Sequence, residues 1–161
     1  MIILLIAAII VLIVADQAAK YWAVENLKTV GNMDFIRIGD LEILDLTYVE
    51  NQGAIFGSMA GQRWFLVGIT SILVIGALIF LFYIVKKSRF FAVISALFVA
   101  GGVGNLIDRI RFGYVVDMFD IELFNFAVFN VADICVTVAE AMMIYYIVFV
   151  ELRKDIARSE E

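Results

Sequence analysis

The chain has 161 residues, of which 64% are hydrophobic, and a mean hydropathy of +1.00, which excludes an ordinary soluble domain and indicates an integral membrane protein. Its net charge of -5 comes from acids spread over connections and tail, and no basic patch points to nucleic acid as a partner. The chain has no histidine and a single cysteine, Cys135, which excludes Ser-His-Asp or Cys-His nucleophile pairs, His-ligated zinc and an internal disulfide.

The first predicted element is a membrane-spanning helix at the N-terminus. Met1 to Ala15 is continuously apolar and is followed by Asp16, Lys20 and Trp22. A bilayer core of about 30 Å needs roughly 20 helical residues, so we expect a span over about 1–22. A cleaved signal peptide is the alternative, but the stretch lacks a basic leading region and carries charges where a cleavage site needs small residues.

A polar connection with strand patterns follows the first span. Ile36 to Ile38 and Leu41 to Ile43 alternate apolar and polar residues about Gly39 and Asp40. This pattern is typical of a hairpin with a two-residue turn. We therefore expect a small β-structured subdomain over about 30–60, lying on the membrane surface between the first and second spans.

Three further spans are expected, over about 64–85, 90–109 and 130–151. In the third of them, Gly101, Gly102 and Gly104 would let a neighbouring helix approach closely. The sequence therefore predicts an all-α membrane protein, with four transmembrane helices and a small extracytoplasmic β subdomain between the first two. We expect residues 1–161 to form a single integral membrane domain.

The basic residues predict the orientation of the spans. The connection between the second and third spans carries Lys86, Lys87 and Arg89 without an acid, and the tail carries Arg153 and Lys154. The positive-inside rule then assigns this connection and both termini to the cytoplasm. The β subdomain and the connection between the third and fourth spans consequently face outward.

Polar residues gather at the outward ends of the spans. At 1.5 Å per residue, Asp16 and Lys20 lie roughly 22 to 28 Å from the cytoplasmic end of the first span. The third and fourth spans bring further polar residues to the same side, namely Asn105, Asp108, Arg109, Asn130 and Asp133. Because ionised groups near hydrocarbon are costly, this cluster is a candidate functional site.

Asp117 and Asp133 are the candidate acid and base. Two carboxyl groups held close together cannot both ionise cheaply, so the ionised one can take a proton from water while the neutral one polarises a peptide carbonyl. The alternatives are structural. Asn130 would cap the fourth helix with Asp133 in its first turn, where the helix dipole favours an acid, and Asp117 would be a solvated loop residue. Spacing alone leaves both interpretations open.

Other polar residues also have two interpretations. Asp16 and Lys20 stand at i and i+4 and are expected to pair, which lowers the cost of either inside a membrane. Alternatively, Lys20 would act as a general base with Ser58. Arg109 would either orient Asp117 or a substrate carbonyl through its planar donor fork, or extend to the membrane interface.

Glu140 lies roughly 15 Å down the fourth helix, on about the same face as Asp133, and is expected to be protonated or paired. Together with Asp16 and Lys20, it also suits a second class of function, a small ion-coupled carrier. The chain lacks the inverted repeat of broken helices found in many carriers. Cys135 has no base to activate it and is expected to be a packing residue.

Five short motifs form a series along the chain. They are Asp16-x-x-x-Lys20, Asn51-Gln-Gly-Ala-Ile-Phe-Gly57, Gly-Asn105-Leu-Ile-Asp108-Arg109, Val-Val-Asp117 and Phe-Asn130-Val-Ala-Asp133. In this order they resemble the bacterial lipoprotein signal peptidases, also called signal peptidase II, over essentially the whole chain. The chain departs from the family pattern at Ile55, Met118 and Glu140.

This resemblance implies an intramembrane aspartic endopeptidase that releases the signal peptide of a diacylglyceryl-modified prolipoprotein by cutting just before the lipidated cysteine. It implies Asp117 and Asp133 as the catalytic pair, and Asp16 with Lys20 as a structural ion pair. It also implies a set of residues that hold the substrate and support the pair, namely Asn51, Gly53, Asn105, Asp108, Arg109, Asn130 and Ala132. No cofactor or metal is implied.

The same resemblance implies the surroundings of the protein. The partners would be the lipid-modified prolipoprotein and membrane lipids, with no nucleic acid, and the protein would act as a monomer. Its location would be the bacterial inner or plasma membrane, with the active site at the extracytoplasmic face. The hairpin region resembles the extracytoplasmic cradle of the family, which covers the substrate at the membrane surface.

Overall fold

The computed structural model describes residues 1–53, 59–124 and 126–151. Ile55, Ser58, Arg153 and Lys154 lie outside the described residues. Within them, the elements follow in the order α1 (Ile2–Val30), β1 (Met33–Ile38), β2 (Leu41–Asn51), α2 (Arg63–Ile84), α3 (Arg89–Arg111), β3 (Val115–Ile121), α4 (Val131–Tyr145) and a π-helical turn (Tyr146–Glu151).

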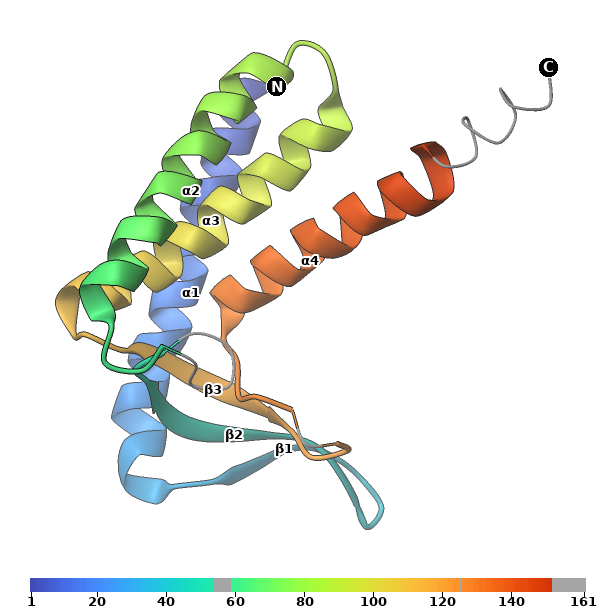
Figure 1. Cartoon of the computed structure of the whole chain (residues 1–161). Coiled ribbons are helices and arrows are strands. Elements are labelled where there is room, and N and C mark those ends of the chain that lie inside the picture. Colours follow the sequence, from blue (N-terminus) through green and yellow to red (C-terminus); the bar gives the residue numbers. More distant parts are fainter. Residues whose placement is uncertain (54–58, 125, 152–161) are drawn as a thin grey trace.

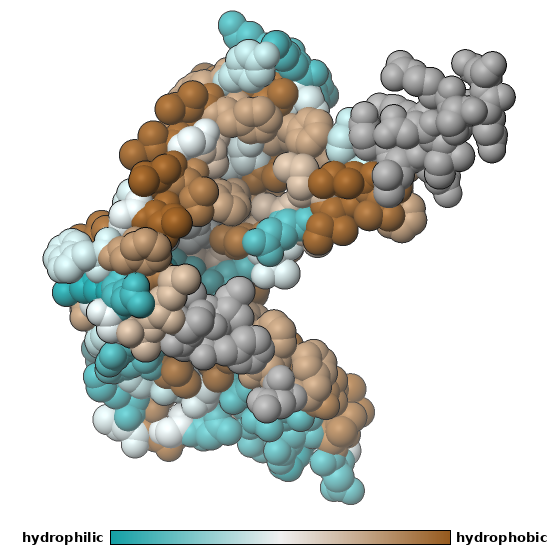
Figure 2. Space-filling view, in the orientation of Figure 1, coloured by the Kyte–Doolittle hydropathy of each residue, from teal (hydrophilic) through white to brown (hydrophobic). Residues whose placement is uncertain are grey.

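Four helices of the described chain are long and apolar enough to cross a membrane, namely α1, α2, α3 and the continuous run Val131–Val150. This confirms the predicted four-helix membrane fold. On the face that Figure 2 shows, apolar side chains cover most of the helices, and polar side chains gather around the sheet and the helix ends. Such a surface suits helices that lie in lipid.

Helix α1 continues beyond the expected span of about 1–22, to Val30. Its last turns pack against the sheet, where Ala23 and Leu27 are fully buried in a cluster with Leu46 and Met118. The apolar stretch from which the span is predicted ends earlier, so hydropathy alone underestimates the length of the helix. The extension ties the first span to the sheet.

The sheet is antiparallel in the order β1-β2-β3 and lies at one end of the helices (Figure 1). The predicted hairpin is present, with Ile38 paired to Leu41 across Gly39 and Asp40. The third strand was not predicted. β3 comes from the connection between α3 and α4 and pairs with β2, with Val49 opposite Asp117. The sheet therefore joins the connection between α1 and α2 to the connection between α3 and α4.

Glycines on α3 allow close contacts with three neighbouring helices, as the sequence predicts. A Cβ at Gly101 would lie 2.3 Å from the carbonyl oxygen of Ala132 on α4, and one at Gly102 would lie 2.5 Å from Val74 Cγ2 on α2. A Cβ at Gly104 would lie 2.6 Å from Asp16 Oδ2 on α1. These contacts pack α3 against α1, α2 and the first turns of α4, while the rest of α4 leans away (Figure 1).

Candidate active site

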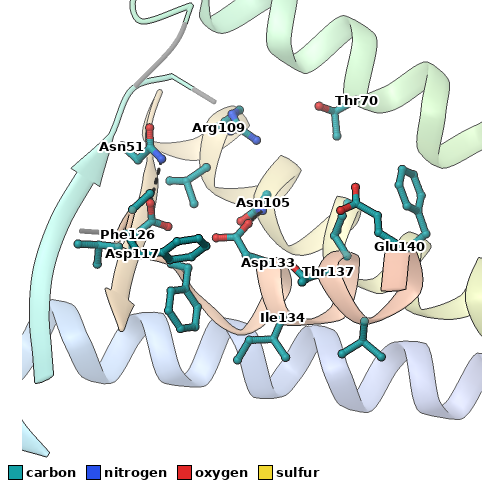
Figure 3. Close-up of a pocket in the computed structure, with 18 of the residues that line it drawn as sticks. Asn51, Thr70, Asn105, Arg109, Asp117, Phe126, Asp133, Ile134, Thr137 and Glu140 are labelled. Carbon is teal, nitrogen blue, oxygen red and sulfur yellow. Dashed lines mark hydrogen bonds between the residues drawn. The ribbon is translucent and has the colours of Figure 1, made fainter. Parts of the chain in front are cut away.

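A pocket of about 550 Å³ lies between the sheet and helices α2, α3 and α4. Asn51 and Asp117 line it from the sheet, Asn105 and Arg109 from α3, and Asp133 from α4 (Figure 3). The two predicted catalytic acids therefore face one cavity, although they come from different elements. The pocket continues along α4 as far as Glu140.

Asp117 lies in β3 and is only 1% exposed, so its interpretation as a solvated loop acid is wrong. Its Oδ2 accepts a hydrogen bond from Asn51 Nδ2 at 2.9 Å, and its Oδ1 accepts one from Asn130 Nδ2 at 2.6 Å. Burial, with a smaller effect from the charge of Asp133, raises the pKa of Asp117 to about 6 against the opposing effect of the Asn51 hydrogen bond. Asp117 therefore keeps its proton to a higher pH than an ordinary aspartic acid does, up to about pH 6.

Asp133 lies in the first turn of α4, and Asn130 caps that helix. The Asn130 side-chain oxygen accepts from the Asp133 backbone N–H at 3.0 Å, while Asp133 Oδ2 accepts from the Asn130 backbone N–H at 3.1 Å. This is a capping box. Asp133 Oδ1 accepts from Asn105 Nδ2 at 2.7 Å. The structural interpretation is thus correct, yet the same carboxyl group lines the pocket.

Asn105 and Asn130 link the two carboxyl groups. Besides its bond to Asp117, the Asn130 side-chain amide donates to Asn105 Oδ1 at 3.1 Å, and the Asn105 amide donates to Asp133. Both amides thereby have fixed orientations, since each donates and accepts at the same time. The two carboxyl groups are held by one continuous chain of hydrogen bonds.

A buried ion cluster lies behind this chain. Lys20 Nζ lies 2.9 Å from Asp16 Oδ2, 3.1 Å from Asp108 Oδ2 and 3.0 Å from Asn105 Oδ1. All three ionised residues are at most 3% exposed. The predicted pairing of Asp16 with Lys20 is present, and Asp108 makes it a triad. The three donors of the ammonium group each have an acceptor, which is the condition for burying a charge.

The two acids of this triad also hold backbone groups of the site. Asp16 Oδ1 accepts from the Ala132 backbone N–H at 2.8 Å, in the first turn of α4, and Asp108 Oδ2 accepts from the Val116 backbone N–H at 3.1 Å, beside Asp117. Gln17 was not predicted but donates to Asp108 Oδ1 at 3.0 Å. The sequence signal that could have identified Gln17 is its position, one residue after Asp16 and three before Lys20.

Gly53 and Arg109 fix the end of β2 over the pocket. The Gly53 backbone N–H donates to Asn51 Oδ1 at 3.0 Å, which orients the Asn51 amide toward Asp117. Arg109 donates to the Gly53 carbonyl at 2.9 Å and lines the pocket. Its guanidinium forms no hydrogen bond with Asp117 within the described ranges, and its hydrogen bond to the Gly53 carbonyl connects it to Asn51 instead.

Two further candidate residues, Cys135 and Glu140, differ in their exposure. Cys135 is buried, as expected for a packing residue. Glu140 is exposed to the pocket, and no hydrogen bond or ion pair to it forms within the described part of the chain, so the expected pairing is not found there. Across these same residues, no group of three or more His, Cys, Asp or Glu side chains could hold a metal ion.

Known proteins resemble this chain in sequence and structure. Residues 8–149 match the protein family described as Signal peptidase (SPase) II. A lipoprotein signal peptidase from Lactococcus lactis subsp. cremoris (strain SK11) is 39% identical over 152 residues, which cover 91% of each chain. One from Clostridium acetobutylicum is 35% identical over 146 residues, which cover 89% of this chain and 92% of its own.

Two solved structures are also similar. Both are described as bacterial membrane enzymes studied by the in meso method, and each has a TM-score of 0.73. The first is 29% identical and covers 96% of this chain and 90% of its own length. The second is 30% identical and covers 91% of this chain and 93% of its own.

Proposed function

Because this chain belongs to the signal peptidase II family, we propose that it is an aspartic endopeptidase that removes the signal peptide from diacylglyceryl-modified prolipoproteins. The scissile bond is the one before the lipidated cysteine. The observation that carries the proposal is that Asp117 and Asp133 line one pocket and are joined through Asn130 and Asn105. The family supplies the substrate class, and these carboxyl groups supply the chemistry.

The reaction needs one proton shared by the pair. We assign that proton to Asp117, whose pKa is raised to about 6, and Asp117 donates a hydrogen bond to the scissile carbonyl. Asp133 as carboxylate takes a proton from water, whose oxygen bonds to the carbonyl carbon. When the C–N bond breaks, Asp133 gives this proton to the leaving amine of the cysteine. One water is consumed, and the new carboxyl group ends the signal peptide.

Supporting residues have distinct roles in this proposal. Asn51, Asn105 and Asn130 orient the carboxyl groups through their hydrogen bonds. Arg109 holds the Gly53 carbonyl at the end of β2, beside the pocket that would take the substrate backbone. The remaining members brace the site from behind and anchor the first turn of α4, namely Asp16, Lys20, Asp108 and Ala132.

The proposed setting is a bacterial cell membrane, with the sheet and the carboxyl pair at the extracytoplasmic face. The cations Lys86, Lys87 and Arg89 at the other end of α2 and α3 support this orientation. Exposed Phe35 and Ile38 on β1 suit a sheet that rests on lipid. The acyl chains of the substrate would stay in the outer leaflet, beside the pair, and one monomer would contain the whole site.

The test is the cleavage of a diacylglyceryl-modified prolipoprotein by purified variants. Asp117→Asn and Asp133→Asn should each abolish cleavage while the protein stays inserted and monodisperse in detergent. Asp120→Asn is the matched control, because it lies in the same strand as Asp117 but does not line the pocket. Full cleavage by either of the first two variants would overturn the aspartic mechanism.

A further inference from the structure

A second polar group lines the pocket away from the carboxyl pair. Thr137 and Glu140 line it from α4, and Thr70 lines it from α2 (Figure 3). Thr137 and Glu140 follow Asp133 by four and seven residues, so the three share one face of the helix. At 1.5 Å per residue, Glu140 lies roughly 10 Å along α4 from Asp133, inside the membrane span.

The polar atoms of this group have no partner in the described chain. The serine hydroxyl groups within α2 and α3 bond to their own helix, since Ser71 donates to the Val67 carbonyl at 2.7 Å and Ser95 to the Phe91 carbonyl at 2.9 Å. No such bond forms at Thr70, Thr137 or Glu140 within the described ranges. An acid at this depth without a partner is costly, so its presence indicates a role in binding.

The rest of this part of the pocket is apolar. Leu73 and Phe98 face it from α2 and α3, and Val136 lines it from α4. Apolar walls alone would suit the hydrophobic segment of a signal peptide. A carboxyl group on such a wall disfavours an apolar side chain opposite it and favours one that donates a hydrogen bond.

We propose that Glu140, with Thr70 and Thr137, forms a specificity subsite for one hydrogen-bond-donating side chain in the membrane-embedded part of the signal peptide. This inference rests on the proposed function. A peptide that leaves the carboxyl pair along α4 covers about 10 Å in roughly three residues when extended and roughly seven when helical. The recognised side chain therefore stands about three to seven residues before the scissile bond.

The experiment couples changes in the enzyme to changes in the substrate. Lipid-modified prolipoproteins carry either Leu or Asn, which have similar shapes, at each of these upstream positions in turn. The measured quantity is the ratio of kcat/KM for the Asn substrate to that for the Leu substrate. At one position, Glu140→Leu should lower this ratio about tenfold relative to the unchanged enzyme. Glu140→Gln should retain most of the ratio, because its amide oxygen still accepts.

Two neighbouring residues of α2 supply a second test variant and its matched control. Thr70→Val removes a pocket hydroxyl without changing the shape of the side chain, and it should lower the ratio at the same position. Ser71→Ala removes a hydroxyl that bonds to its own helix and does not line the pocket, so it should leave the ratio unchanged. Equal effects of these two variants would contradict the subsite.

The outcomes separate this inference from the proposed function. If the unchanged enzyme cuts the substrates and Glu140→Leu leaves the ratio the same at every position, the subsite is overturned while the peptidase stands. If the unchanged enzyme cuts none of the substrates, the proposed function fails, and the subsite fails with it. A ratio that changes only in Glu140→Leu and Thr70→Val supports both.

Discussion

The side-chain amide of Asn130 donates a 2.6 Å hydrogen bond to Asp117, although the same residue is the N-cap of α4. A helix cap usually satisfies only its own helix. Here the cap also reaches across to a strand that comes from the preceding connection. The start of α4 is therefore positioned by the same residue that holds the buried carboxyl group of β3.

The first prediction separates these two functions of Asn130. In Asn130→Ser, the hydroxyl group can still cap α4 but is too short to donate to Asp117 as well. We expect cleavage to fall about tenfold or more, since a hydrogen bond to a charged group contributes about 1.5 to 3 kcal/mol. The melting temperature in detergent should change little. Asn130→Ala, which also loses the cap, should lower both. Full activity in Asn130→Ser would mean that the bond to Asp117 is dispensable.

The four spans and the hairpin could be predicted because hydropathy and alternation are local signals. β3 could not. Val115, Val116 and Met118 are all buried, so the strand has no alternation of apolar and polar residues. Its partner, β2, lies far away in the sequence, on the other side of two spans. Only the folded chain brings the two connections together.

The pairing of Asp16 with Lys20 could be predicted from their spacing, but most other contacts among the candidate site residues could not. Asp133 caps α4, as its structural interpretation predicts, and it also lines the pocket, so its spacing alone could not decide between the two interpretations. Asp108 and Gln17 enter the ion cluster through hydrogen bonds between α1 and α3. Such bonds depend on how each helix is rotated about its own axis relative to the other. The periodicity of apolar residues along the sequence does not specify that rotation.

The second prediction concerns the buried ion cluster. Lys20→Met removes the only cation of the triad and leaves Asp16 and Asp108 buried next to each other. We expect a loss of about 3 to 5 kcal/mol in the free energy of unfolding, measured by denaturation in mixed micelles. Lys28→Met is the control, because Lys28 pairs with Glu50 at the surface and its loss should have little effect. Equal stability of the two variants would refute the cluster as a brace.

The third prediction is a pH dependence that follows from Asp117. Its pKa is raised to about 6, so the shared proton is lost as the pH rises through this value, and kcat/KM should fall. The Asn51 hydrogen bond favours the ionised form, so Asn51→Leu should move this loss to higher pH. The contribution of Asp117 to the stability of the fold also decreases as the pH rises. Asp117 favours folding most below its ordinary pKa of 3.8, and this contribution is lost as the pH rises through about 6.

The pH profile of Asn51→Leu decides whether Asp117 causes the loss. A profile that keeps its midpoint, with only a lower maximum, would assign the loss to another group. Asp117→Asn cannot serve in the activity profile, since it should be inactive. It can serve in melting experiments, where its stability should vary less with pH than that of the unchanged protein between about pH 4 and pH 6.

The last prediction concerns the close contact of α3 with α1. In Gly104→Ala, the new methyl group would lie 2.6 Å from Asp16 Oδ2 and 3.0 Å from Ala132 Cβ. Asp16 cannot move aside, because Lys20 and the Ala132 backbone N–H hold its carboxylate. We expect a loss of about 1 to 3 kcal/mol in stability, together with reduced cleavage, since α4 is displaced. Gly76→Ala, with nothing within 4 Å, should be neutral or stabilising. The reverse order of stability would contradict this packing.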